Sequence, residues 1–162
     1  MRKLILLFFI LLPLTGFSQE VSKDAPLFTG YSETGDTIKL LDLRGKVIIL
    51  DFWASWCGPC KHEFPFLIDL YNKYSEKDFS VLTVNVDENS SSMNKFLSGI
   101  GKDVPFKIIS DRKSKLPELY NLDAMPSSFF IDKKGVIRFA HTGFTDSDKD
   151  KFIKEIEKLL SE

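Results

Sequence analysis

The residues most able to do chemistry are Cys57 and Cys60, the only cysteines among 162 residues, separated by Gly58 and Pro59. A disulfide between residues i and i+3 can open and close only across a tight turn, which Gly-Pro supplies at a helix start. Backbone N–H groups at a helix N-terminus stabilise a thiolate. We therefore expect Cys57 to be an accessible nucleophile with a pKa below about 8.5. Cys60 should attack the mixed disulfide from within and release the reduced target.

Two other uses of the cysteine pair compete with redox chemistry. The pair could form half of a zinc site, but a closed site needs four ligands, and the only histidines are His62 and His141. It could also be an inert structural disulfide, although a bridge that closes so short a loop adds little stability. Both alternatives stay open beside the redox interpretation.

The segment before the cysteines predicts a central strand. Residues 47–54 are a nearly continuous apolar run, which is typical of a strand buried on both faces. Asp51 is the one charge inside it, and a buried charge is costly without a task or a partner. Apolar residues at helical spacing then predict a helix over residues 59–74, so the helix begins at the cysteine motif.

The remaining segments alternate between strand and helix patterns. We expect a β-hairpin within residues 25–43, and further strands and helices at the positions that follow. The expected strands cover 79–86, 106–109, 127–131 and 136–140, and the expected helices cover 91–100, 116–120 and 146–160. This order predicts an α/β fold with a mixed central sheet flanked by helices, whose βαβ part is parallel and whose last hairpin is antiparallel.

The first 18 residues have the pattern of a signal peptide, with a basic start and a short apolar run. A retained membrane anchor is the alternative, because the run is nearly long enough to span a bilayer. No cysteine stands directly after the leader to accept a lipid, so a lipoprotein anchor is excluded. We expect one domain over residues 24–162 in a periplasmic or secreted protein. The net charge is −1 before leader removal, which argues against nucleic-acid binding.

The segment from Asp51 to Lys61, Asp-Phe-Trp-Ala-Ser-Trp-Cys-Gly-Pro-Cys-Lys, closely resembles the active-site segment of thioredoxins. Gly45-Lys46-Val47, Glu63-Phe64-Pro65 and the run from Met125 to Asp132 are similar to the exported TlpA and ResA branch of that superfamily. The likeness covers residues 24–160. It implies a thioredoxin fold with an N-terminal β-hairpin and a TlpA-type insertion before the strand that follows Pro126.

The resemblance also implies roles for the two acids. Asp51 matches the buried acid that serves the inner cysteine in proton transfer in cytoplasmic thioredoxins. Glu63 matches an acid that ResA-like proteins hold beside their cysteines, and this chain has both. Thr83 stands where thioredoxins carry a buried lysine that interacts with the acid, so the proton route here can differ from theirs.

Substrate-facing positions follow from the same resemblance. Pro126 matches the family's cis-proline, and Met125 before it is expected to pair through its backbone with an extended substrate. Trp56 matches the exposed indole beside the nucleophile. Gly143 matches the glycine that leaves room for a docking partner. With Gly58 and Pro59, these residues form the expected substrate-binding surface.

The sequence therefore predicts an enzyme, a thiol-disulfide oxidoreductase that reduces disulfides of exported proteins, apocytochrome c among them. Its expected redox group is the Cys57–Cys60 disulfide, with no other cofactor and no metal. The chain has no second redox pair, so a membrane thiol donor should re-reduce it, and we expect a monomer. The alternatives are a copper-delivery protein, whose cysteines are usually separated by three residues, and a peroxiredoxin-type peroxidase, which expects a differently composed cysteine loop.

Overall fold

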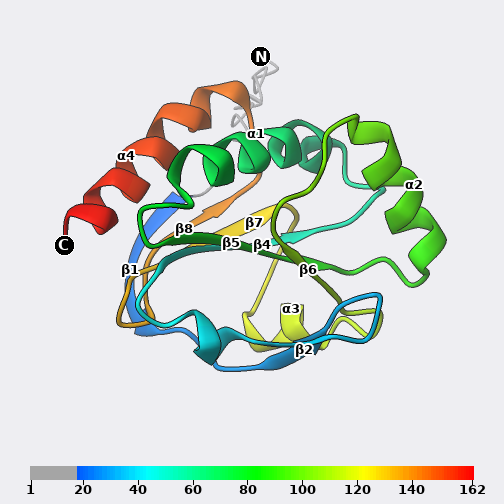
Figure 1. Ribbon diagram of the computed structural model, residues 1–162, viewed down its shortest axis with the longest axis horizontal. Coiled ribbons are helices and arrows are strands. Elements are labelled where there is room, and N and C mark those ends of the chain that lie inside the picture. The colour runs from blue at the N-terminus through cyan, green and yellow to red at the C-terminus, as the bar shows by residue number, and fades with distance from the viewer. Residues whose placement is uncertain (1–17) are drawn as a thin grey trace, which may run out of the picture.

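The computed structural model describes residues 18–162, and the predicted leader lies outside them except for Ser18. A mixed sheet has α1 and α4 on one face and α3 with the small hairpin on the other (Figure 1). The strands are β1 (Ser18–Asp24), β2 (Thr29–Tyr31), β3 (Thr37–Lys39), β4 (Val47–Trp53), β5 (Phe79–Asn85), β6 (Lys107–Ser110), β7 (Ser127–Ile131) and β8 (Val136–Thr142). The helices are α1 (Gly58–Tyr74), α2 (Ser90–Ile100), α3 (Lys115–Leu119) and α4 (Lys149–Ser161), with 3-10 turns η1 (Leu40–Leu43) and η2 (Asp146–Asp148). Within these residues no helix is long and apolar enough to cross a bilayer.

Strand β4 lies inside the six-stranded sheet, whose order is β1-β8-β7-β4-β5-β6. It pairs in parallel with β5 and antiparallel with β7, and all seven of its residues are buried. Burial on both faces explains why its sequence is nearly continuously apolar. The predicted central strand is confirmed.

The predicted strand directions are also confirmed. Strands β4, β5 and β6 run parallel, whereas β7 and β8 form an antiparallel hairpin. Strands β2 and β3 form the expected N-terminal hairpin as a separate two-stranded sheet. Helix α2, strand β6 and helix α3 come between β5 and β7, where the resemblance placed an insertion.

Strand β1 was not predicted. It pairs antiparallel with β8, and its register shifts between Glu20 and Lys23. The segment Ser-Gln-Glu-Val-Ser-Lys-Asp has one apolar residue and therefore no alternating pattern. Its pairing depends on the free edge of β8, a tertiary contact. The sheet consequently begins at Ser18, before the predicted start of the domain at residue 24.

The alternation of side chains along β4 decides what lies beneath α1. Trp53 contacts Phe64 of α1, with ring centroids 4.7 Å apart, whereas Phe52 contacts Tyr120 beyond α3 at 5.3 Å. Successive residues of a strand face opposite sides of the sheet. Asp51 therefore lies on the same face as Trp53, under the helix that begins at the cysteines.

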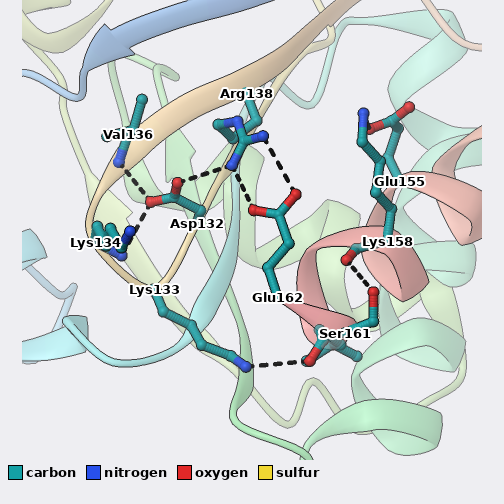
Figure 2. Close-up of polar contacts among 10 residues, drawn as sticks. Asp132, Lys133, Lys134, Val136, Arg138, Glu155, Lys158, Ser161 and Glu162 are labelled. Carbon is teal, nitrogen blue, oxygen red and sulfur yellow. Dashed lines mark hydrogen bonds and ion pairs between the residues drawn. The ribbon is translucent and has the colours of Figure 1, made fainter.

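Polar contacts fasten the end of α4 to the β7–β8 hairpin (Figure 2). Arg138 of β8 lies between Asp132 at 3.2 Å and Glu162 at 2.6 Å, and Lys133 donates to the carbonyl of Leu160 at 3.1 Å. These contacts hold α4 across the same face of the sheet as α1.

Candidate active site

Cys57 and Cys60 are joined in a disulfide at the start of α1, with their Cα atoms 5.3 Å apart. Cys57 is the residue before the first helical position, and its sulfur accepts the backbone N–H of Cys60 at 3.2 Å. Gly58 and Pro59 are exposed and form the first two positions of the helix. A proline is tolerated there because the N–H that it lacks would have no intrahelical partner. The prediction that the helix begins at the cysteine motif is confirmed.

The expectation that Cys57 is accessible is wrong for the disulfide form. Cys57 is 4% exposed and Cys60 is 1% exposed. The reason is geometric, because the Cys57 sulfur is occupied by the bridge and by the N–H of Cys60. Trp56 is the exposed member of this loop, with 70% of its surface open to solvent.

Asp51 of β4 and Glu63 of α1 meet between the strand and the helix, and both are buried. The hydroxyl of Ser128 on β7 connects them. Its Oγ is 3.1 Å from Asp51 Oδ1 and 2.8 Å from Glu63 Oε1. Asp51 and Ser128 are register partners on β4 and β7, which explains why their side chains meet. The family resemblance includes Ser128 in the segment from Met125 to Asp132 but implies no role for it.

Burial dominates the electrostatics of both acids. It raises the pKa of Asp51 to about 7, against the lowering effect of the Ser128 hydrogen bond and the Phe52 backbone. It also raises the pKa of Glu63 well above its usual value, and the negative charges of Asp51 and Asp148 raise that pKa further. The Ser128 hydrogen bond opposes these effects. A carboxyl group with a pKa of about 7, as Asp51 has, can take up and release a proton near neutral pH.

Helix geometry places Glu63 close to the inner cysteine. Glu63 follows Cys60 by three positions on α1, and both side chains are buried. Residues at this spacing have Cβ atoms about 5–6 Å apart on one helix face. Thr83, the register partner of Asp51 on β5, is buried, and its hydroxyl has no hydrogen-bond partner among the described residues. Thr83 therefore brings no cation to Asp51, unlike the lysine of thioredoxins.

Asp87 is a second residue that the sequence analysis missed. Its carboxylate accepts the backbone N–H of Ser55 at 3.2 Å and the Ser55 hydroxyl at 2.9 Å. It also accepts the side-chain amide of Asn85 at 2.9 Å. These bonds anchor the loop between β4 and Cys57 to the end of β5. Only the fold brings Asp87 to Ser55, so sequence spacing offered no signal.

The structure brings the predicted docking residues together. The Met125–Pro126 bond is cis, as the resemblance implied. The N–H of Gly143 donates to the Pro126 carbonyl at 2.8 Å, and Gly143 has a φ of +81°, which favours glycine. Met125 and Trp56 line the same hollow, together with Asp87 and Arg112. This hollow lies beside the disulfide loop.

The two histidines differ in burial. His62 is exposed on α1. His141 is buried on β8 with its Nε2 3.5 Å from Asp148 Oδ1, and burial lowers its pKa. Among residues 18–162, no three His, Cys, Asp or Glu side chains are grouped so that they could hold a metal ion.

The fold and the cysteine pair define a thioredoxin-fold protein with dithiol-disulfide chemistry. The profile of the AhpC/TSA family matches residues 21–140, and the chain belongs to this family. It is 35% identical over 138 residues to the thiol-disulfide oxidoreductase ResA of Geobacillus kaustophilus, covering 85% of this chain and 78% of that protein. It is also 35% identical to ResA of Bacillus cereus strain ZK / E33L over 118 residues, covering 73% of this chain and 67% of that protein.

Solved structures agree with this assignment. A putative thiol:disulfide interchange protein DsbE from Chlorobium tepidum superposes with a TM-score of 0.82 at 38% identity, covering 87% of this chain and 98% of that one. A putative thioredoxin from Neisseria meningitidis gives a TM-score of 0.74 at 31% identity, covering 86% of this chain and 91% of the other. The protein is therefore a thiol-disulfide oxidoreductase with a thioredoxin fold.

After reduction, we expect iodoacetamide to modify Cys57 before Cys60. Cys57 stands at the N-terminus of α1, where the thiolate is stabilised, and Cys60 lies deeper. Mass spectrometry of the modified peptide, repeated against pH, gives the order and the midpoint of the rate. Faster labelling of Cys60, or a midpoint at or above about 8.5, would reverse the assigned roles.

Asp51→Asn should stabilise the folded protein, and more so as the pH rises. Between the unfolded pKa of about 3.9 and the folded pKa of about 7, the folded state binds more protons, so stability falls by up to about 1.4 kcal/mol per pH unit. The asparagine removes this loss. Chemical denaturation should show little difference near pH 4 and a gain on the order of a few kcal/mol above pH 7. The exposed Asp123→Asn is the control, and a gain independent of pH would contradict the burial argument.

Asp87→Ala should loosen the loop before Cys57, because the N–H and hydroxyl of Ser55 lose their acceptor. We expect a loss of about 1–3 kcal/mol of stability and faster hydrogen exchange of the Ser55 amide. Glu88→Ala changes the exposed neighbouring acid and serves as the matched control. Equal exchange of the Ser55 amide in both variants would show that Asp87 does not anchor the loop.

Proposed function

We propose that this protein reduces disulfides of exported proteins, by a cycle in which Cys57 and Cys60 alternate between dithiol and disulfide. The observation that carries the proposal is the pair of buried carboxyls, Asp51 and Glu63, which Ser128 connects, with Glu63 three positions after Cys60 on α1. A reductase has to remove a proton from its inner thiol before that thiol can attack.

The proposed cycle has two thiol-disulfide exchange steps. The Cys57 thiolate attacks one sulfur of the target disulfide, and the other target sulfur leaves as a thiolate. Cys60 passes its proton to the carboxyls and attacks Cys57, which forms the Cys57–Cys60 bond and releases the second target sulfur. Two electrons thus pass from the protein to the target, and an external thiol donor must return them.

The direction of exchange rests on the residues between the cysteines. Gly58 and Pro59 are the dipeptide of thioredoxin, whose potential is about −270 mV, against about −120 mV for the oxidant DsbA. The hollow lined by Trp56 and Met125 would receive an extended segment around the target cysteine. The backbone of the Met125–Pro126 loop would contribute most of the contacts, so several sequences around a target cysteine could be accepted, apocytochrome c among them.

The proposed location is outside the cytoplasm, in the periplasm or secreted, because residues 1–18 have a signal-peptide pattern. A membrane protein that carries thiol electrons outward would then be the donor. Fractionation of the cells would distinguish a soluble, processed chain from one that an uncleaved leader keeps in the membrane.

Cys60→Ser should trap the natural partners as mixed disulfides with Cys57. The adduct is normally short-lived because Cys60 attacks it at high effective concentration. The variant is expressed in its own compartment, quenched with acid and separated without reductant. The double variant Cys57→Ser, Cys60→Ser is the control.

The identity of the trapped proteins decides among the finer readings. An apocytochrome c supports cytochrome biogenesis, many exported proteins support a general reductase, and a membrane thiol protein is the donor. No adduct beyond the control would overturn the exchange mechanism. Stoichiometric copper uptake would then support the copper-delivery alternative, and peroxide consumption without a thiol partner would support the peroxidase alternative.

A further inference from the structure

Among the residues that the structure describes, the Ser128 hydroxyl is the one side-chain group that hydrogen-bonds both Asp51 and Glu63. Its Oγ lies 3.1 Å from Asp51 Oδ1 and 2.8 Å from Glu63 Oε1, and all three side chains are buried. A serine hydroxyl has one proton to donate and lone pairs to accept. It can donate to one carboxylate only, so the other carboxyl must donate its own proton to the Ser128 oxygen if both bonds are to exist.

We propose that Asp51, Ser128 and Glu63 form one proton-sharing unit, which holds a single acidic proton in the neutral pH range and in which Ser128 is the positioning residue. The state with two ionised carboxylates would break one of the two hydrogen bonds and place two like charges in a buried site. The state with both carboxyls protonated would give up a charge-assisted bond from Ser128.

The groups around the unit favour one negative charge rather than two. Asp148 of η2 acts on Glu63 with the same sign as Asp51 does. Ser128 has His141 as its register partner on β8, and burial lowers the pKa of that imidazole, which favours its neutral form. On the other side, Thr83 of β5 carries no charge. No cation among the described residues is a cause of the raised pKa of either acid, so a shared proton takes the place of a counter-ion.

The singly charged unit can accept one more proton, and Cys60 can donate it. Glu63 is one helical turn after Cys60, and its Oε2 has no hydrogen-bond partner among the described residues. In the proposed cycle, on which this role rests, the Cys60 thiol gives its proton to the singly charged unit, which becomes neutral. The released target thiolate then takes a proton, directly or from solvent, and the unit returns to its singly charged state.

The experiment is a pH titration of the oxidised protein by NMR, with ¹³C labels on the carboxyl carbons of Asp and Glu. We expect the Asp51 and Glu63 signals to move together in two steps, with the second step near or above neutral pH. Asp51→Asn removes the like charge and should lower the pKa of Glu63 by about one unit or more. Glu63→Gln should do the same to Asp51.

Variants of two adjacent serines test the position of Ser128. Ser128→Ala removes the donor to the ionised carboxylate and should raise the pH of the first step, whereas Ser128→Thr keeps a hydroxyl and should restore it. Ser127→Ala is the matched control, because the Ser127 hydroxyl bonds the Ala124 carbonyl at 2.8 Å instead. Circular dichroism verifies that each variant is folded. If one variant does not fold, the titrations of the remaining variants still test the proposal.

Independent titration of the two carboxyls at ordinary acidic pH would overturn the proposal, as would a Glu63 pKa that Asp51→Asn leaves unchanged. Equal effects of Ser128→Ala and Ser127→Ala would remove Ser128 from the unit. The measurement uses no substrate and no turnover. A failed trap with Cys60→Ser therefore counts against the proposed reductase alone, and a failed titration counts against the proton-sharing unit alone.

Discussion

The active site depends on the burial of β4 at the junction with α1. Strands β5 and β7 hydrogen-bond β4 on both edges, and α1 covers the face that carries Asp51. The strand ends directly before the loop that leads to Cys57, so its position sets the place of the cysteines. The same burial removes water from Asp51, which raises the pKa of its carboxyl to about 7.

A buried acid without a counter-ion lowers the stability of the fold at neutral pH, and this site contains two, Asp51 and Glu63. Within residues 18–162 neither carboxyl has an ion pair, and each has a hydrogen bond to Ser128. A purely structural site would be more stable with apolar or amide side chains. The retention of two acids beside a cysteine pair is consistent with a requirement for proton transfer, and active sites are where such perturbed groups gather.

The rest of the fold keeps this site in place from separate parts of the chain. Asp87, after β5, anchors the loop before Cys57, and Gly143, after β8, bonds to the cis-proline loop. The contacts of Arg138 fasten α4 to the β7–β8 hairpin (Figure 2), on the side of the sheet that α1 also covers (Figure 1). The disulfide itself is local, whereas the surface around it is assembled from several strand ends.

Local patterns were sufficient to predict the central strand within residues 47–54, the helix that begins at the cysteines, and the final hairpin, because periodicity and turn residues are properties of short segments. The cysteine spacing and the family resemblance identified the redox pair, both acids and the cis-proline. Local patterns did not predict strand β1, because its formation depends on pairing with the edge of β8. The positions of Ser128 and Asp87 depend on strand register, which joins residues 77 and 32 positions apart. The sequence by itself therefore determined the chemistry of the cysteines and the class of fold. Only the tertiary structure decided how Asp51 and Glu63 meet through Ser128, because long-range strand pairing sets that arrangement.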